Sequence, residues 1–221
     1  MKYTHTLLAA AALACSGAVM AQTAGSWSAS VGLTSLNPAV DSGNLSAPSL
    51  PNTKVGVNSN TQLTGAVNYM VTDNIAVSVP IGFGFKHEVT GAGAIAGAGK
   101  LADTKGLPIT VLGQWRFMDA KAQWRPYLGA GLTYAKFYGT NGTAVLTALT
   151  NPGGPPTTLS FKSKLVPTIQ LGAIVNLNEK WYLDVNYTKT FLTTTGSLST
   201  GQTIDVKLNP STVALGVGYK F

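Results

Sequence analysis

Residues 75–85 read IAVSVPIGFGF, and this stretch decides the fold class. Its odd positions are aliphatic or aromatic, and its even positions are small residues or proline. Because strand side chains alternate between two faces, the pattern gives one apolar face and one face of small or weakly polar residues. A helix would spread the apolar residues around its circumference. The stretch also has the length of about 9–11 residues that a tilted membrane-spanning strand needs. It predicts one strand of a transmembrane β-barrel.

The start of the chain has the features of an export signal. Lys2 supplies positive charge, and the apolar stretch that follows is too short to span a bilayer as a helix. Val19-Met20-Ala21 resembles the small-x-small site at which signal peptidase cuts. We therefore expect residues 1–21 to be a cleaved signal peptide and residues 22–221 to be a single domain. A second interpretation makes Cys15 the lipid-bearing first residue of a lipoprotein, although the residues before it fit that pattern poorly.

The composition places the exported chain among outer-membrane proteins. Charged residues make up 10% of the sequence, glycine occurs 25 times, and mean hydropathy is +0.19. No apolar run reaches the length of about 18 residues that indicates a membrane-spanning helix. The single cysteine lies within the predicted signal, so the remaining chain has neither a disulfide scaffold nor a cysteine nucleophile. Together these features predict a β-barrel in the bacterial outer membrane.

Alternation of the same kind recurs along the chain, and its segments are joined by connections that are alternately short and long. The expected strands are residues 27–34, 62–71, 75–85, 107–117, 124–134, 165–176, 181–188 and 204–221. The expected short turns are residues 72–74, 118–123 and 178–180, and the long loops are residues 37–59, 87–103, 139–160 and 193–201. The fold class is therefore all-β, an eight-stranded antiparallel transmembrane barrel with short periplasmic turns and longer extracellular loops. Such a barrel has an interior just wide enough for side chains or one small ligand.

The last expected strand changes phase at Asn209-Pro210. Before this dipeptide the apolar residues occupy even positions, and after it they occupy odd positions. A slip of one residue turns every following side chain to the other face, so we predict a bulge or kink there.

Aromatic residues cluster at the strand ends beside the short turns. Aromatic rings prefer the membrane interface, where the ring stays in acyl chains and its polar edge stays wet. The predicted membrane-interface girdle contains Trp27, Tyr69, Trp115, Phe117, Trp124, Trp181, Tyr219 and Phe221. A thinner ring is expected at the far strand ends, with Phe83, Phe85, Tyr134, Tyr138, Tyr187 and Phe191. The alternative is that these are core aromatics of a soluble periplasmic β-sandwich.

The inward face of the expected barrel is mostly small, hydroxylated or mildly apolar. The residues predicted to line the lumen and the passage of substrate are Met70, Pro80, Pro108, Leu112, Tyr127, Phe137, Val166 and Ile174. A water-filled pore would need more inward charge than this. The inward polar residues lie towards the short-turn end, where we expect Arg116 or Arg125 to pair with Asp184 and plug the barrel. The alternative is simple packing of a narrow floor.

Four prolines lie inside expected strands, namely Pro80, Pro108, Pro126 and Pro167. Proline cannot donate to the ladder of a sheet, and a closed barrel has no edge on which to place it. One hypothesis is that one or more of them weakens a seam through which a hydrophobic molecule leaves sideways. The alternative, for any single proline, is a bulge that shapes the barrel.

The sequence offers little for catalysis, for cofactors or for nucleic acid. His87 is the only histidine after the predicted signal, and beside Glu88 it has neither metal-site nor catalytic spacing. The Gly91–Gly99 segment lacks the strand-to-helix context of a nucleotide loop, and no Gly-x-Ser-x-Gly pattern occurs. We expect no enzyme, no metal and no cofactor. The net charge of +7 comes mainly from lysines in loops, which an exported protein uses for solubility, and some strand-end lysines are expected to meet lipopolysaccharide phosphates.

Several stretches resemble the OmpW family of outer-membrane proteins, which includes the alkane-uptake protein AlkL. They are Gly25-Ser26-Trp27, residues 68–75 (NYMVTDNI), Phe85-Lys86-His87, Leu107-Pro108, Gln114-Trp115, residues 125–131 (RPYLGAG) and residues 218–221 (GYKF). The resemblance implies an eight-stranded barrel for the passive passage of small hydrophobic molecules, closed towards the periplasm, with sideways exit into the membrane. It also implies recognition of the terminal Phe221 by the barrel-assembly machinery. The long first loop and the Gly/Ala-rich second loop depart from the family.

The sequence therefore leaves two functions open for a membrane barrel. The first is a conduit for small hydrophobic solutes. The second is a non-transporting barrel whose extracellular loops act in adhesion, as a receptor or in envelope stability.

Overall fold

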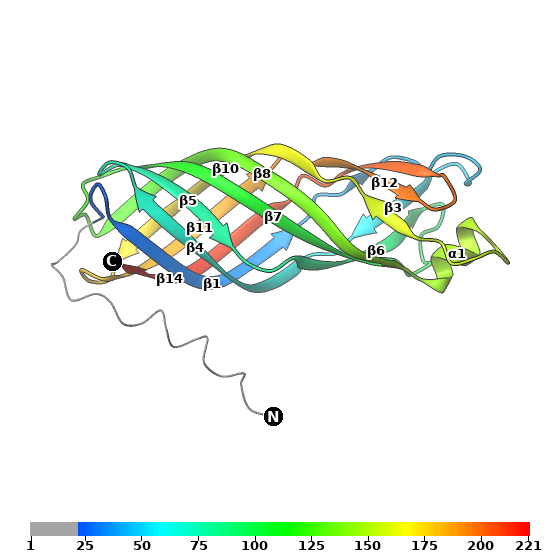
Figure 1. The fold of residues 1–221 in the computed structure, drawn as a ribbon, viewed down its shortest axis with the longest axis horizontal. Helices are drawn as coiled ribbons and strands as arrows, with labels where there is room; N and C mark the ends of the chain where they lie inside the picture. Colours follow the sequence, from blue (N-terminus) through cyan, green and yellow to red (C-terminus); the bar gives the residue numbers. More distant parts are fainter. Residues whose placement is uncertain (1–21) are drawn as a thin grey trace, which may run out of the picture.

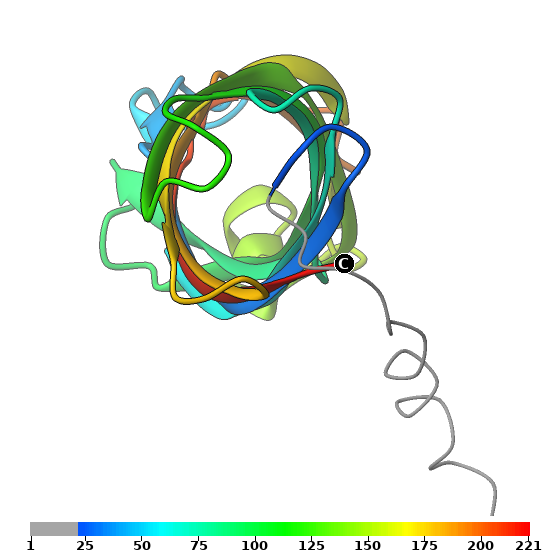
Figure 2. The ribbon, with the colours of Figure 1, turned by 90° about the vertical axis from the view of Figure 1, so that its left-hand side faces the viewer.

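A computed structural model describes residues 22–221 and shows a closed antiparallel barrel of eight strands (Figure 1). The barrel strands are β1 (Trp27–Asn37), β4 (Asn60–Met70), β5 (Ile75–Ile81), β7 (Lys100–Arg116), β8 (Trp124–Gly142), β10 (Lys164–Asn176), β11 (Trp181–Thr190) and β14 (Ser211–Lys220). Each pairs with the next in this order, and β14 pairs with β1, which closes the ring seen end-on in Figure 2. The predicted fold class is confirmed. The signal peptide prediction falls on residues outside the described range.

The two ends of the barrel differ. The short-turn end carries the turns at residues 71–74, 117–123 and 177–180, together with the C-terminus (Figure 1). The long-loop end carries the four long connections. Figure 2 looks onto the short-turn end, and there the dark blue segment before β1 turns into the opening of the barrel. Chain segments therefore lie across the opening at this end.

The barrel turns its apolar faces outward. In β5, Val77 and Val79 are exposed on the outside, whereas Ala76 and Ser78 are buried inside. Leu63 and Leu165 on other strands are 63% and 64% exposed. This is the arrangement of a barrel in lipid, because apolar strands would otherwise leave these stripes in water. The alternative of a soluble β-sandwich, which needs its aliphatic stripes between two sheets, is wrong.

The long connections are more ordered than expected. They form β2 (Asp41–Ser42), β3 (Thr53–Val57), β6 (Phe85–Gly93), β9 (Leu159–Phe161), β12 (Thr193–Leu198), β13 (Thr203–Lys207) and the short helix α1 (Ala144–Thr150). The prediction of a loop over residues 87–103 is wrong except for residues 94–99, because β6 pairs with both β3 and the first part of β7. Buried Val89, Leu101 and Leu198 form an apolar core there. Within residues 22–221, no helix has the length and apolar character needed to cross a membrane.

The predicted break at Asn209-Pro210 is present. Asn209 has a left-handed φ of 32°, and the dipeptide separates β13 from β14. The two strands belong to different sheets, since β13 joins the sheet β2-β13-β12-β9 of the long-loop end and β14 belongs to the barrel. The phase change in the sequence thus marks the place where the chain passes from one sheet to the other.

Candidate functional site

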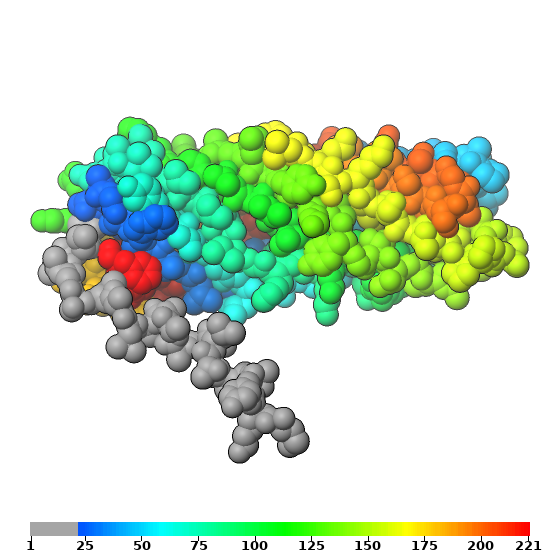
Figure 3. All heavy atoms as spheres, viewed as in Figure 1, coloured from blue at the N-terminus to red at the C-terminus, as the bar shows by residue number. Residues whose placement is uncertain are grey.

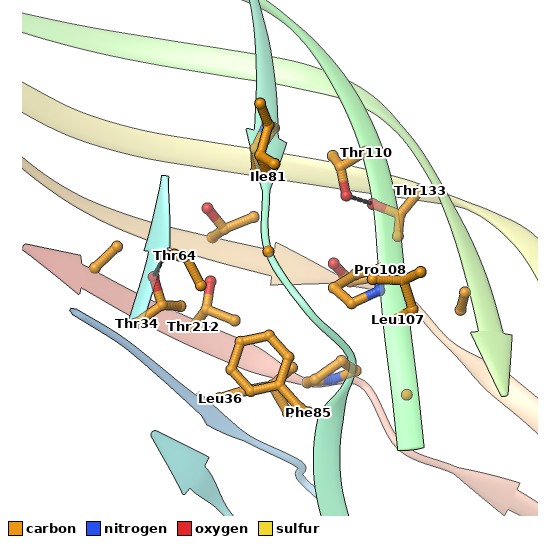
Figure 4. A pocket seen from close by; sticks show the side chains of 18 of the residues that line it. Thr34, Leu36, Thr64, Ile81, Phe85, Leu107, Pro108, Thr110, Thr133 and Thr212 are labelled. Carbon is orange, nitrogen blue, oxygen red and sulfur yellow. Dashed lines mark hydrogen bonds between the residues drawn. The ribbon is translucent and has the colours of Figure 1, made fainter. Parts of the chain in front are cut away.

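The barrel encloses a cavity of about 190 Å³ (Figure 4). It lies on the long-loop side of the buried polar residues that close the short-turn end, which we call the floor. Five of the eight predicted lumen residues line this cavity: Pro80, Pro108, Leu112, Tyr127 and Phe137. The other three, Met70, Val166 and Ile174, are buried but are not among the residues that line it. The lining is mainly aliphatic, aromatic and threonine side chains.

The wall of the cavity is interrupted between β5 and β7. Ladder pairing of β5 with β7 ends at Ser78↔Leu112, and pairing of β6 with β7 begins at Phe85↔Gly106. Between these pairs, the six residues 79–84 face the five residues 107–111, and no ladder pair joins them. We call this unpaired stretch the seam.

The extra residue at the seam changes which side chains point inward. Phe83 is 86% exposed on the outside, whereas Phe85, two positions later, is 4% exposed and lines the cavity. The prediction that Phe85 joins the outer aromatic ring is wrong, because one added residue shifts the alternation by one position. His87 follows the same phase and is buried against the cavity, where its Nδ1 lies 2.8 Å from the Asn58 carbonyl oxygen.

The cavity reaches the outer surface at the seam. Residues from both sides of the seam, including Ile81 and Leu107, line the cavity, and Ile81 is 54% exposed. Figure 3 shows a hollow between β5 and β7, through which dark red and blue atoms of the opposite wall are visible. The cavity is therefore open to the outer face of the barrel wall at this place.

The prolines divide into two groups. Pro80 lies among the unpaired residues of one side of the seam, and Pro108 lies on the other side. Pro126 and Pro167 lie in continuous ladders, opposite Ala173 and Leu132. The seam hypothesis therefore applies to Pro80 and Pro108, whereas Pro126 and Pro167 lie at the ends of the β7–β8 and β10–β11 ladders and border no unpaired stretch of wall.

A second cavity of about 90 Å³ lies among the strands of the long-loop end. It is lined almost wholly by aliphatic side chains, from β3, β6, β7, β12 and α1 among others. Val55, Val89 and Phe161 line both this cavity and the larger one. We call these three residues the neck, since they separate the outer cavity from the lumen.

The floor of the barrel is a buried polar network around two arginines. Arg116 and Arg125 are 1% and 0% exposed. Both donate to the same oxygen, Oε1 of Gln22, with Nη1 of Arg116 at 2.9 Å and Nη1 of Arg125 at 3.4 Å. Arg116 also donates to Gln114 Oε1 through Nη2 at 3.1 Å. Sequence reasoning missed Gln22, because it stands before the first strand and outside any alternating pattern.

The expected ion pair between an arginine and Asp184 is not formed within the described chain. Asp184 instead accepts a hydrogen bond from the Tyr127 hydroxyl at 2.9 Å and lines the cavity, which neither arginine does. Neutral amide oxygens take the place of the carboxylate as acceptors for Arg116. Arg116, Arg125 and Asp184 do lie in the same end of the barrel, but the predicted ion pair between an arginine and Asp184 is wrong.

The Tyr127–Asp184 contact gives a first prediction. Asp184→Ala should lower the free energy of unfolding by about 1–3 kcal/mol, because it leaves the buried Tyr127 hydroxyl without its acceptor. Asp184→Asn keeps an acceptor oxygen and should cost less. Urea unfolding in detergent micelles and single-channel conductance would test this pair. Unchanged stability and conductance in Asp184→Ala would remove Asp184 from the floor network.

The aromatic residues predicted for the girdle lie at the short-turn end. Five of the eight rings contact one another in two groups, with centroids 4.9 Å apart for Trp27–Tyr69 and for Trp181–Tyr219, and 5.4 Å apart for Tyr219–Phe221. The exposed members are Trp27, Trp115, Phe117, Trp124, Trp181 and Phe221. At the far strand ends Phe83, Tyr134, Tyr138, Tyr187 and Phe191 are exposed as expected. The membrane-interface role of both rings stays a prediction.

Comparison with known proteins agrees with this architecture. The model of the OmpW family matches residues 23–221. Outer membrane protein W of Vibrio cholerae is 34% identical over 229 residues, which cover 100% of both chains. Outer membrane protein AlkL of Ectopseudomonas oleovorans is 25% identical over 202 residues, covering 89% of this chain and 83% of that one. The crystal structure of outer membrane protein OprG from Pseudomonas aeruginosa superposes with a TM-score of 0.81 at 27% identity, covering 90% of this chain and 97% of the other.

Proposed function

The chain belongs to the OmpW family of outer-membrane proteins, and from this premise we propose that it lets small hydrophobic molecules cross the outer membrane passively. The observation that carries the proposal is a cavity that reaches the lipid-facing surface at the seam, above a floor closed by Arg116 and Arg125. The route has three parts, which are the outer cavity, the neck and the lumen. We propose that solute leaves the lumen sideways at the seam and not through the floor.

Sideways exit follows from the polarity of the two possible routes, one through the floor and one through the seam. At the floor, a hydrophobic molecule would have to separate the buried hydrogen bonds of Arg116 and Arg125, and it would gain no contact in return. At the seam, Ile81 and Phe83 offer exposed apolar surface beside an unpaired stretch of wall. An apolar solute that moves from this surface into lipid never has to enter water, so it keeps the free energy gained by leaving water.

The dimensions favour single small molecules over bulk water. A cavity of about 190 Å³ in an eight-stranded barrel holds one small ligand, and the floor network blocks a continuous aqueous path. The proposal is therefore a conduit without chemical catalysis.

Blocking the neck tests the proposed function. Val89 is 1% exposed and lines both cavities, so Val89→Trp should fill the passage between them. We expect uptake of a hydrophobic solute by a deletion strain carrying this variant to fall by about tenfold relative to the unmodified protein, a loss that corresponds to about 1.4 kcal/mol in the barrier. The measurement is the initial rate of uptake in whole cells, with folding checked by heat modifiability of the barrel on gels.

Val145→Trp is the matched control, because Val145 is exposed on α1 and lines neither cavity. If both variants and the empty deletion strain take up solute as fast as the unmodified strain, transport is not the role of this barrel. A change in cell adhesion or envelope integrity in that strain would then favour the non-transporting alternative.

A further inference from the structure

The middle of the cavity carries a set of threonines from nearly all of the barrel strands. Eight threonines line the cavity, and seven of them belong to this set: Thr34 of β1, Thr64 of β4, Thr110 of β7, Thr133 of β8, Thr188 and Thr190 of β11, and Thr212 of β14. The eighth, Thr104, lies near the start of β7 and bonds to Thr140 instead. Thr168 of β10 joins the seven through hydrogen bonds. We call these seven residues and Thr168 the threonine belt. Figure 4 shows Thr34, Thr64 and Thr212 on one side of the cavity and Thr110 and Thr133 on the other.

Six of the eight belt hydroxyls are hydrogen-bonded to one another, in two separate groups. Thr110, Thr133, Thr168 and Thr190 form a chain with oxygen–oxygen distances of 2.8, 2.6 and 3.1 Å. Thr34 and Thr64 form a separate pair at 2.6 Å. Thr188 and Thr212 stand directly opposite each other in the ladder of β11 and β14. The belt is therefore a ring of hydroxyls in three neighbouring groups, namely a hydrogen-bonded chain of four, a hydrogen-bonded pair and two facing residues.

The links leave hydrogen-bonding capacity unused. Each hydroxyl has one donor and two acceptor lone pairs. Three bonds in the four-residue chain use three of its four donors, and one bond in the Thr34–Thr64 pair uses one of its two. Each group thus has a donor left over, together with several lone pairs, and these face a cavity that is otherwise largely apolar.

The belt carries no charge. The ionisable residues that line the cavity are Asp184 with its partner Tyr127, Lys136, and His87 beside Asn58. An ion at the level of the belt would lose its hydration without meeting an opposite charge there. A plain hydrocarbon would cover the free hydroxyl capacity without replacing the water that otherwise satisfies it. A neutral group that accepts hydrogen bonds, or that both donates and accepts them, meets neither difficulty.

From this arrangement, and resting on the proposed function, we infer that the passage is built for neutral amphipathic molecules, which carry one hydrogen-bonding group such as a hydroxyl or a ketone on a short apolar chain. The polar group binds at the belt and the apolar chain lies along the aliphatic lining. Among the eight barrel strands, β5 contributes no threonine to the belt, and β5 is also the strand at which the wall opens. The apolar chain can therefore reach the seam between Ile81 and Leu107 while the polar group is still bound (Figure 4).

The test compares three solutes of equal chain length, n-octane, 2-octanone and octanoate, in the deletion strain. The variant is Thr34→Val/Thr64→Val, which removes both partners of an isolated pair and leaves no orphaned hydroxyl. We expect protein-dependent uptake of 2-octanone to fall by about threefold to tenfold, as the loss of one hydrogen bond predicts, and that of n-octane to stay unchanged or rise. The control is Thr61→Val/Thr193→Val, two exposed threonines outside the cavity, which should change neither rate.

The outcomes separate this inference from the proposed function. If n-octane and 2-octanone depend on the protein but the belt variant leaves their ratio unchanged, the belt does not recognise the polar group and the inference fails. Protein-dependent uptake of octanoate as fast as that of 2-octanone would overturn the restriction to neutral molecules. If none of the three solutes depends on the unmodified protein, the proposed function itself fails.

Discussion

Replacing Pro80 and Pro108 together with valine should lower the uptake of a hydrophobic solute by about tenfold or more. Each proline lacks the N–H that a ladder needs, and the two lie on opposite sides of the seam. Valine restores the N–H and favours extended backbone. Each ladder hydrogen bond contributes about 0.5–1.5 kcal/mol, so two new bonds across the seam make its opening about tenfold rarer.

The chain supplies a matched control for this variant. Pro126 and Pro167 stay paired in the β8–β10 ladder, and their carbonyls accept hydrogen bonds from Phe117 and Phe191 where the neighbouring ladders end, so Pro126→Val/Pro167→Val should leave uptake unchanged. Uptake rates of both double variants, measured beside the single Pro80→Val, would also show how much of the effect one proline carries. If uptake persists undiminished in Pro80→Val/Pro108→Val, solute does not leave by the seam.

The fold could be predicted from the sequence because the alternation that marks each strand is local. In residues 75–81 every outward position is apolar and every inward position is small or proline, and the structure keeps that arrangement. Short turns such as Thr72-Asp73-Asn74 are equally local, since Asp and Asn bond to nearby backbone. These signals fixed the number of barrel strands and the outward direction of Trp27, Trp115 and Trp124.

What could not be predicted depends on partners that are distant in the sequence. The face of Phe85 depends on how the six residues 79–84 oppose the five residues 107–111 of β7, and the pattern within residues 75–85 does not contain that count. The strand character of residues 87–93 comes from pairing with β3 and β7. Opposite charges suggested that Arg116 or Arg125 pairs with Asp184, but the pattern does not give the height of a side chain along the barrel. The structure places neutral Gln22 and Gln114 at the height of Arg116.

Arg125→Met should lower the free energy of unfolding by about 2–5 kcal/mol, the largest effect that we expect from one substitution in the floor. The guanidinium of Arg125 donates to the carbonyl oxygens of Asp73 at 2.6 Å, Phe117 at 3.3 Å and Met118 at 3.4 Å. Two periplasmic turns are thereby held to one buried side chain. Methionine has a similar length and no donors, so the carbonyls of Asp73 and Phe117 lose their partner, whereas that of Met118 keeps the Asn74 side chain as a donor. Urea unfolding in micelles, followed by tryptophan fluorescence, measures the loss.

Arg125→Lys separates the charge of Arg125 from its geometry. Lysine keeps the positive charge, but its single ammonium group cannot reach carbonyls that the planar guanidinium contacts from different nitrogens. We expect it to recover less than half of the stability lost in Arg125→Met, while Lys121→Met, an exposed change in one of the same turns, should have little effect. Full stability in Arg125→Lys would mean that charge alone holds the floor. Low stability in Arg125→Lys would mean that the geometry of the guanidinium holds the floor. The backbone carbonyls of the turns would then provide the partial negative charge that a carboxylate usually provides to a buried arginine.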